Sequence, residues 1–258
     1  MTQLRRRHVV TSLASLPLAA VLADPRLARA AAAGLQEVDL TTQGGKAVKA
    51  SLALPARTPA PTLLLIHEWW GLNDQIKSVA ADLAGQGYVA LAVDLYDGKL
   101  AGPGDREQAR NYMQGVVEAE ATDTLVSWVA WLKGHEGATG KVGTVGWCFG
   151  GGWSLNTGIA TPVDATVAYY GRVNRTAEDL KALKGPVLGH FATQDQWINK
   201  EMVSGFEAAM KAAGKTATNH WYEADHAFAN PTSARYDEAD AKLAWERTLA
   251  FFAANLQG

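Results

Sequence analysis

The stretch KVGTVGWCFGGGWSLNTGIA, from Lys141 to Ala160, decides the fold of this chain of 258 residues. Residues 141–147 predict a strand, and residues 150–160, which follow almost at once, predict a helix. The turn between them contains Cys148, the only cysteine of the chain, with Gly146 before it and Gly150 after it. A sharp strand-to-helix turn of this kind exposes the side chain at its apex.

Strand-like and helix-like segments alternate on both sides of this turn. Strands are predicted over 35–40, 47–54, 62–67, 88–93, 141–147, 164–170, 186–192 and 216–222, and helices over 73–87, 105–133, 150–160, 176–184, 199–214 and 236–256. The first two strands form a hairpin, and the nearly all-apolar run TLLLIH is typical of a strand buried on both faces. This alternation predicts an α/β fold, a mostly parallel central sheet with helices on both faces, in one domain over 31–258.

The first 30 residues have the pattern of an export signal. The arginines at 5–7 precede a short apolar run from Val9 to Ala23, and Ala28-Arg29-Ala30 follows as a small-residue cleavage site. The paired arginines resemble a twin-arginine signal, so we expect a bacterial periplasmic or secreted protein. The apolar run is too short to span a membrane. The alternative is an alanine-rich helix at the start of a cytosolic protein.

Charge and cysteine content exclude several classes of partner. Without residues 1–30 the chain carries 19 basic and 25 acidic residues, a net charge of −6, so nucleic acid is not expected as a partner. A lone cysteine cannot form an intramolecular disulfide. No Cys/His cluster has metal-site spacing, so neither a metal nor a cofactor is expected.

Cys148 lies in the context of a nucleophile elbow, the strand–turn–helix motif G-x-nucleophile-x-G. The two glycines let the turn pack closely, and the backbone N–H of Phe149 points to where an oxyanion would form. The N-terminus of the following helix favours a thiolate. The alternative is a small buried cysteine in a glycine-rich turn.

Two residues further along the chain complete a candidate triad. Asp195 follows the strand over 186–192, and His226 lies in the loop after the strand over 216–222. The order nucleophile, acid, histidine at the carboxyl ends of strands is that of the α/β-hydrolase fold. His226 can accept the thiol proton, and Asp195 can orient the imidazole. His67, which ends a strand at the same edge, remains a competing base.

The chain resembles the dienelactone hydrolase family over nearly all of residues 35–255. The matching residues are His67-Glu68-Trp69-Trp70-Gly71-Leu72-Asn73, Gly87-Tyr88, Asp94-Leu95-Tyr96, Gly146-Trp147-Cys148-Phe149-Gly150-Gly151, Gln194-Asp195 and His226-Ala227-Phe228. A cysteine elbow combined with a glutamate at the first strand end is specific to this family.

The resemblance implies roles for the matching residues. It implies a Cys148–His226–Asp195 triad and an oxyanion hole formed by the backbone N–H groups of Phe149 and Trp69. Glu68 would hold the thiol neutral at rest and release it to His226 when substrate binds. Such control would protect the thiol in an oxidising compartment, because oxidation follows thiolate character.

The substrate side matches the family only in part. Arg106 occupies the position at which the family places an arginine for a substrate carboxylate, and the alternative is a solvated helix charge. The family's second arginine is replaced by Asn230, for which Arg235 or Arg172 could substitute. The loss of one charge-assisted contact weakens selection for a small anionic lactone by about 1.5–3 kcal/mol. Indoles next to the predicted site indicate an aromatic or apolar substrate: Trp69, Trp70, Trp147 and Trp197.

These features predict a monomeric hydrolase of small carboxylic esters or lactones that acts through a thioester. A broader carboxylesterase or thioesterase on the same triad is the first alternative. The second is a non-catalytic exported binding protein, against which the intact nucleophile, base and acid argue.

Overall fold

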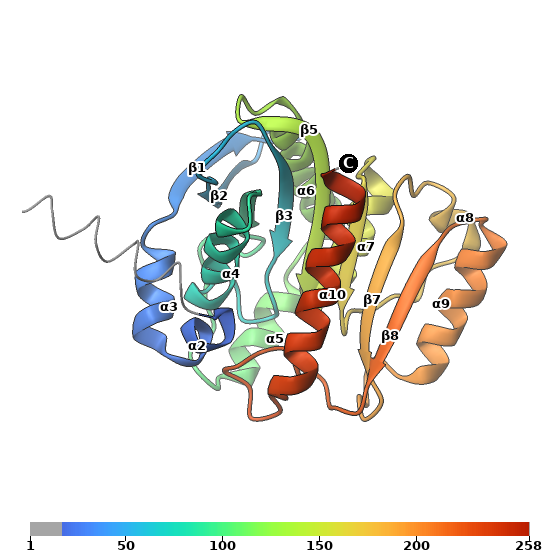
Figure 1. The fold of residues 1–258 in the computed structure, drawn as a ribbon. Helices are drawn as coiled ribbons and strands as arrows, with labels where there is room; N and C mark the ends of the chain where they lie inside the picture. The colour runs from blue at the N-terminus through green and yellow to red at the C-terminus, as the bar shows by residue number, and fades with distance from the viewer. Residues whose placement is uncertain (1–16, 258) are drawn as a thin grey trace, which may run out of the picture.

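The fold is built on one eight-stranded sheet, in a computed structural model that describes residues 17–257. The strands are β1 (Gln36–Thr41), β2 (Ala47–Ala53), β3 (Ala60–Ile66), β4 (Val89–Val93), β5 (Ala138–Trp147), β6 (Ala165–Tyr169), β7 (Val187–Ala192) and β8 (Ala217–Tyr222). Their order across the sheet is β1-β2-β4-β3-β5-β6-β7-β8 (Figure 1). The pairs β1–β2 and β2–β4 are antiparallel, and every other pair is parallel. The predicted hairpin and mostly parallel sheet are therefore confirmed.

Helices cover both faces of the sheet, as predicted. They are α2 (Leu18–Ala23), α3 (Pro25–Ala32), α4 (Asp74–Gly85), α5 (Arg106–Gln114), α6 (Glu118–Gly134), α7 (Phe149–Ala160), α8 (Ala177–Leu180), α9 (Lys200–Ala212) and α10 (Glu238–Leu256). Helices α4 and α10 pack on one face of the sheet, while α6, α7 and α9 pack on the other (Figure 1).

Two helices differ from the sequence prediction. The long helix predicted over 105–133 is interrupted, because α5 ends at a glycine cap, Gly115, and α6 begins only after Val117. Glycine and β-branched valine both disfavour the helix interior, so Gly115 and Val117 already indicate a break in the sequence. The helix predicted over 176–184 is limited to α8, which a capping box of Thr176 and Asp179 starts.

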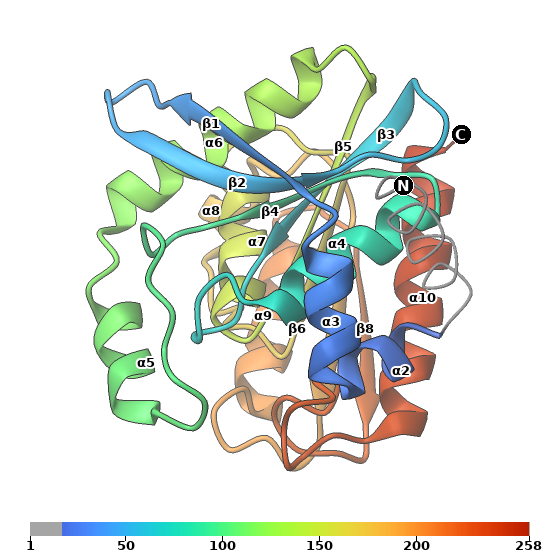
Figure 2. The same cartoon turned by 90° about the vertical axis from the view of Figure 1, so that its left-hand side faces the viewer.

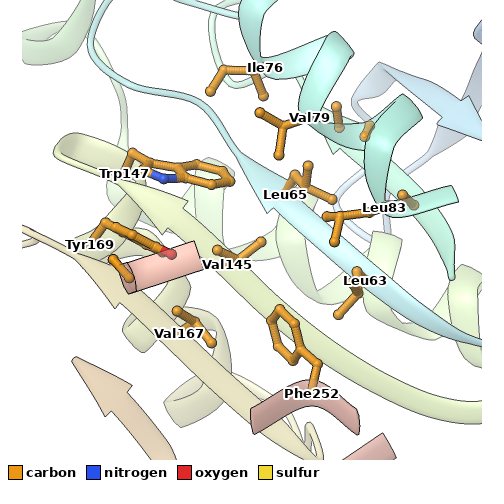
Figure 3. Packing of buried hydrophobic residues seen from close by; sticks show 14 of the residues in the cluster. Leu63, Leu65, Ile76, Val79, Leu83, Val145, Trp147, Val167, Tyr169 and Phe252 are labelled. Carbon is orange, nitrogen blue, oxygen red and sulfur yellow. The ribbon is translucent and has the colours of Figure 1, made fainter. Parts of the chain in front are cut away.

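The core on the α4–α10 face explains why the central strands contain so few polar residues. All seven residues of β3 are buried, as its apolar sequence predicts. Figure 3 shows alternate side chains of β3, β5 and β6 facing α4 and α10. The residues that pack there include Leu63, Leu65, Ile76, Val79, Leu83, Val145, Val167 and Phe252. Their burial holds the strand ends in a fixed register, with Ile66 of β3 opposite Gly146 of β5.

The N-terminal helices lie against α4 (Figure 2). Val21, Leu22 and Ala28 are buried there, and the hydroxyl of Ser78 donates a hydrogen bond to the Ala28 carbonyl at 2.8 Å. Residues 1–16, which include the arginines of the predicted export signal, lie outside the described residues. Among residues 17–257, no helix combines the length and apolarity needed to cross a bilayer.

Candidate active site

The candidate site lies at the carboxyl ends of the parallel strands, and Cys148 occupies its sharpest turn. Cys148 follows β5 directly and caps α7, with φ of 55° and ψ of −116°. A side chain on Gly146 would overlap the Gly150 carbonyl, and one on Gly150 would overlap the Ile66 carbonyl. The elbow therefore requires both glycines, as the sequence predicts. The positive φ costs about 1–3 kcal/mol, which the surrounding structure must supply.

The amides of Phe149 and Trp69 lie just beyond the ends of two neighbouring strands, β5 and β3. Phe149 is the first residue of α7, where backbone N–H groups have no partner within the helix. Trp69 follows Glu68 directly after β3, and β3 is the neighbour of β5. Within residues 17–257, neither amide donates to another protein group. Both are thus free to bind an oxygen that carries negative charge.

His226 and Asp195 form a short, buried hydrogen bond. The Nδ1 atom of His226 donates to Oδ2 of Asp195 at 2.6 Å, and the Asp195 side chain is fully buried. The other carboxyl oxygen, Oδ1, accepts from the backbone N–H groups of Trp197 at 2.8 Å and Ile198 at 3.0 Å. These contacts fix the carboxylate, which in turn fixes the imidazole and its tautomer.

The electrostatics of this pair favour a proton on His226. Burial lowers the pKa of His226, but the hydrogen bond with Asp195 and the neighbouring Cys148 outweigh burial and raise the pKa to about 10. Burial raises the pKa of Asp195, yet the hydrogen bonds from His226, Ile198 and Trp197 bring it below its ordinary value. An imidazole in this state can take a thiol proton and hold it.

The Glu68 carboxyl is hydrogen-bonded to Tyr170 and Asn230 rather than to the Cys148 thiol. Its carboxyl is buried, with Oε1 accepting from the Tyr170 hydroxyl at 3.2 Å and Oε2 accepting from Nδ2 of Asn230 at 2.7 Å. Burial raises the pKa of Glu68, against the lowering effect of both hydrogen bonds. Within the described residues no hydrogen bond joins this carboxyl to Cys148, the contact that the family resemblance implies.

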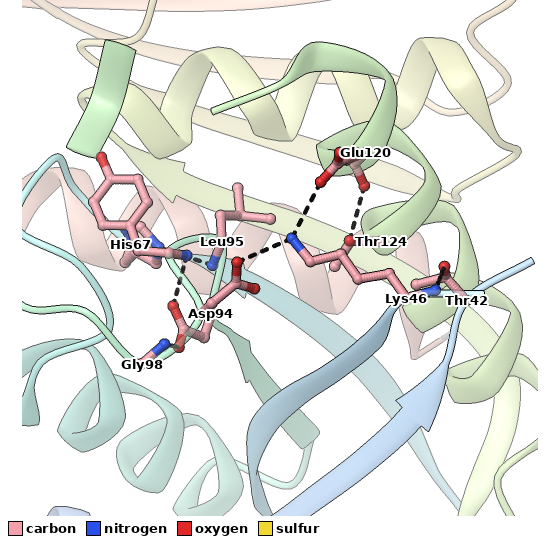
Figure 4. Close-up of polar contacts among 10 residues, drawn as sticks. Thr42, Lys46, His67, Asp94, Leu95, Gly98, Glu120 and Thr124 are labelled. Atoms are coloured by element: carbon pink, nitrogen blue, oxygen red, sulfur yellow. Dashed lines mark hydrogen bonds and ion pairs between the residues drawn. The ribbon is translucent and has the colours of Figure 1, made fainter. Parts of the chain in front are cut away.

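The competing histidine His67 has a structural role. Its Nδ1 donates to the Glu68 carbonyl at 2.5 Å. Its Nε2 accepts from the backbone N–H of Leu95 at 3.2 Å (Figure 4). Burial lowers the pKa of His67, so the ring is neutral. Both ring nitrogens are therefore occupied by the backbone, and His67 ties the end of β3 to the segment after β4.

A separate polar hollow of about 160 Å³ lies between the segment after β4 and the helices α5 and α6. Lys46 bridges its rim through ion pairs with Asp97 at 3.1 Å and Glu120 at 3.3 Å (Figure 4). Its lining does not include Cys148, Asp195 or His226. The hollow is thus distinct from the candidate active site.

Two tryptophan–arginine pairs flank the site. The guanidinium of Arg106 lies over the ring of Trp69 at 5.9 Å, and that of Arg235 lies over Trp197 at 5.4 Å. The ring of Trp197 is 5.2 Å from the ring of His226, although half of the Trp197 surface is exposed. The mouth of the site therefore combines apolar aromatic surface with positive charge.

The other predicted site residues lie further from the reaction centre. The indole of Trp147 is buried and stacks on Tyr169 at 5.6 Å, where it forms part of the core (Figure 3). Trp70 is half-buried and contacts Trp69 edge-to-face. Arg172 is exposed and lies beside Gly152, at the start of α7.

Tyr170 is a site residue that the sequence analysis did not identify. It follows β6 with a positive φ of 34°, and its ring lies 5.1 Å from that of His226. The position directly after a parallel strand was the available signal, since Cys148 and Asp195 follow strands in the same way. Among the described residues, no group of three or more possible ligands could hold a metal ion.

A cysteine elbow, a histidine and an aspartate at successive strand ends of this sheet define a protein of the α/β-hydrolase fold. Comparison with known proteins is more specific, because the model of the dienelactone hydrolase family matches residues 48–256. The chain belongs to the dienelactone hydrolase family, and it is a hydrolase.

Individual relatives cover most of the chain. A Methylorubrum extorquens protein assigned as a carboxymethylenebutenolidase is 35% identical, over 97% of this chain and 93% of its own. The carboxymethylenebutenolidase of Pseudomonas putida is 30% identical, over 84% of this chain and 95% of its own. A Klebsiella pneumoniae crystal structure assigned as a dienelactone hydrolase is 28% identical, with a TM-score of 0.74, over 85% of this chain and 99% of its own.

Proposed function

We propose that this protein hydrolyses small carboxylic esters or lactones, as a carboxymethylenebutenolidase does, through a Cys148–His226–Asp195 triad. The observation that carries the proposal is the His226–Asp195 hydrogen bond of 2.6 Å beside an elbow cysteine. His226 holds the proton of the thiol, and Asp195 stabilises the resulting imidazolium. The names of the relatives support the same class of substrate.

The reaction proceeds through a thioester. The sulfur of Cys148 attacks the carbonyl carbon, and the oxyanion accepts hydrogen bonds from the amides of Phe149 and Trp69. Collapse of this intermediate expels the alcohol or enol, which takes its proton from His226. Water then attacks the thioester, with His226 as the base, and releases the carboxylic acid and the thiol.

The substrate side supports esters with an aromatic or otherwise flat group. Trp197 presents an exposed indole next to His226, and Arg106 lies over Trp69. Arg106 can bind a substrate carboxylate with its planar set of donors. Asn230 is buried, uncharged and bonded to Glu68, so it does not replace the charge of the family's second arginine. A broader carboxylesterase or thioesterase is therefore the second candidate.

The deciding experiment compares wild type with Cys148→Ala on an aryl acetate and on a dienelactone. We expect wild type to hydrolyse at least the aryl acetate, and the variant to lose this activity because it lacks the nucleophile. Iodoacetamide inactivates wild type, and substrate protects it. Full activity of the variant, or a thiol inert to alkylation, contradicts the triad. Absence of any ester turnover by wild type favours a binding protein.

We further propose that the protein is exported to the periplasm or secreted. The support is the sequence of residues 1–30, with its arginines at 5–7 and the small residues Ala28-Arg29-Ala30. Cleavage after Ala30 removes α2 and most of α3. N-terminal sequencing of the protein from the periplasmic fraction should give Ala31 as the first residue. A cytosolic protein that retains its N-terminus contradicts the proposal.

A further inference from the structure

Both the oxygen and the nitrogen of the Asn230 side-chain amide form hydrogen bonds. Its Oδ1 accepts hydrogen bonds from the backbone N–H of Thr232 at 2.9 Å and from the Thr232 hydroxyl at 2.7 Å. Its Nδ2 donates to Oε2 of Glu68 at 2.7 Å. Two donors at one end and an acceptor at the other fix the orientation of the amide. Asn230 is buried, so solvent does not compete for these contacts.

Glu68 is held from a second direction by Tyr170. The Tyr170 hydroxyl donates to Oε1 of Glu68 at 3.2 Å, so each carboxyl oxygen has its own donor. Glu68, Tyr170 and Asn230 are all at least nine-tenths buried. Breaking either contact would leave a buried polar group without a partner, which is unfavourable. This cost keeps the carboxyl in its place.

The thiol has a different partner. His226 is hydrogen-bonded to Asp195, and the neighbouring Cys148 also raises the pKa of His226. The ring of Tyr170 packs against that of His226 at 5.1 Å, while the Tyr170 hydroxyl binds Glu68. Among the described residues, the site thus contains two separate hydrogen-bonded groups, which are His226–Asp195 next to Cys148 and Asn230–Glu68–Tyr170.

We propose that Asn230 is a positioning residue that keeps the Glu68 carboxyl away from Cys148, so that the thiol is paired with His226 before any substrate binds. The inference rests on the proposed function, in which Cys148 is the nucleophile. Activation then requires no charged group on the substrate, because the donor that holds Glu68 is supplied by the protein itself. Neutral esters can therefore react with a Cys148 thiol that is already paired with His226.

The test measures the alkylation rate of Cys148 by iodoacetamide as a function of pH, in the absence of any ester. Iodoacetamide reacts with the thiolate, so the pH midpoint reports on the charges next to the sulfur. Asn230→Ala frees Glu68 to approach Cys148. We expect its alkylation rate at pH 7 to fall about tenfold, with the midpoint raised by about one pH unit.

A double-mutant cycle with Glu68→Gln separates positioning from a general structural effect. If Asn230 acts through the Glu68 carboxyl, Asn230→Ala has no further effect on the midpoint in the Glu68→Gln background. Asn230→Leu, which keeps a similar volume and removes the donor without adding a charge, serves as a second variant if the alanine variant does not fold. Asn219→Ala, which breaks an exposed hydrogen bond to Glu207 of 3.0 Å, is the matched control and should leave the profile unchanged.

An unchanged midpoint in Asn230→Ala, or an equal shift with and without the Glu68 carboxyl, overturns the inference. The assay separates this result from failure of the proposed function, since alkylation needs no ester. If wild type hydrolyses esters but Asn230→Ala has the alkylation midpoint of wild type, only the positioning role of Asn230 is wrong. If wild type hydrolyses no ester but the midpoint moves in Asn230→Ala, the positioning role of Asn230 stands and the esterase assignment is wrong.

Discussion

Cys148 has a strained backbone, and the proposed partners of its thiol are His226 and Asp195. Its φ of 55° is a conformation that L-residues rarely adopt, and such strain occurs at sites where a side chain must be presented. His226 and Asp195 approach it from the ends of two other strands, and the 2.6 Å hydrogen bond between them aligns the imidazole. At the scale of the residue, the proposed catalysis depends on this alignment.

Asp195→Asn tests the alignment directly. The amide cannot stabilise an imidazolium and favours the wrong tautomer, which in a serine protease lowers kcat by roughly 10⁴-fold. We expect a loss of at least about 10²-fold here, measured as kcat on an aryl acetate, with an unchanged circular dichroism spectrum. Asp179→Asn, in the exposed capping box of α8, is the control and should retain wild-type kcat. Wild-type turnover in Asp195→Asn would remove Asp195 from the proposed triad.

At the scale of the element, the strand–helix junction of β5 and α7 positions the nucleophile. The junction works because Gly146 and Gly150 let the turn approach the end of β3 without a side chain between them. The pattern of glycines around Cys148 indicates this junction in the sequence, although a small buried cysteine in a glycine-rich turn has the same local pattern. The interruption between α5 and α6 was less evident, because helical periodicity continues on both sides of Gly115.

Gly146→Ala should disrupt the junction, because its Cβ would overlap the backbone of Gly150. The expected result is a loss of several kcal/mol in the free energy of unfolding, or no soluble protein. Gly85→Ala at the end of α4 is the matched control, since a Cβ there meets no atom within 4 Å. Its unfolding free energy, from urea titration, should equal or exceed that of wild type by up to about 1 kcal/mol. Equal stability of the two variants would contradict this account of the elbow.

At the scale of the whole molecule, the sequence predicted the architecture better than the site. Period and composition placed all eight strands and the layers, because burial on both faces leaves a strong signal. They could not show that Trp147 turns into the core, or that His67 is tied by backbone groups on both nitrogens. Such roles depend on side-chain direction and on contacts between distant segments. The Asn230–Glu68 bond, which joins residues 162 positions apart, is of the same kind.

A buried polar network connects the sheet to α10 and makes stability depend on pH. His190 is hydrogen-bonded to the Tyr222 hydroxyl at 2.8 Å and to Oγ1 of Thr248 at 3.0 Å. Burial, and then the charges of His220 and Arg247, hold its pKa well below the ordinary value. The unfolded chain binds a proton near pH 6.5 that the folded chain does not, so stability falls as pH drops below 6.5.

His190→Gln should reduce this dependence on pH. One such group contributes a slope of up to about 1.4 kcal/mol per pH unit below its unfolded pKa. We expect the free energy of unfolding, from urea titrations between pH 7.5 and about 5, to fall less steeply in the variant than in wild type. Parallel curves for the two proteins would show that His190 is protonated in the folded state.

The central claim is that Cys148 forms a covalent acyl-enzyme during ester hydrolysis. Rapid acid quenching of the enzyme with a p-nitrophenyl acetate substrate, followed by peptide mass spectrometry, tests it most directly. The account predicts one acetyl group on the peptide that contains Cys148, formed together with a burst of p-nitrophenol and absent in Cys148→Ala. Continued turnover of the ester by Cys148→Ala, or an acetyl group on another residue, would contradict it.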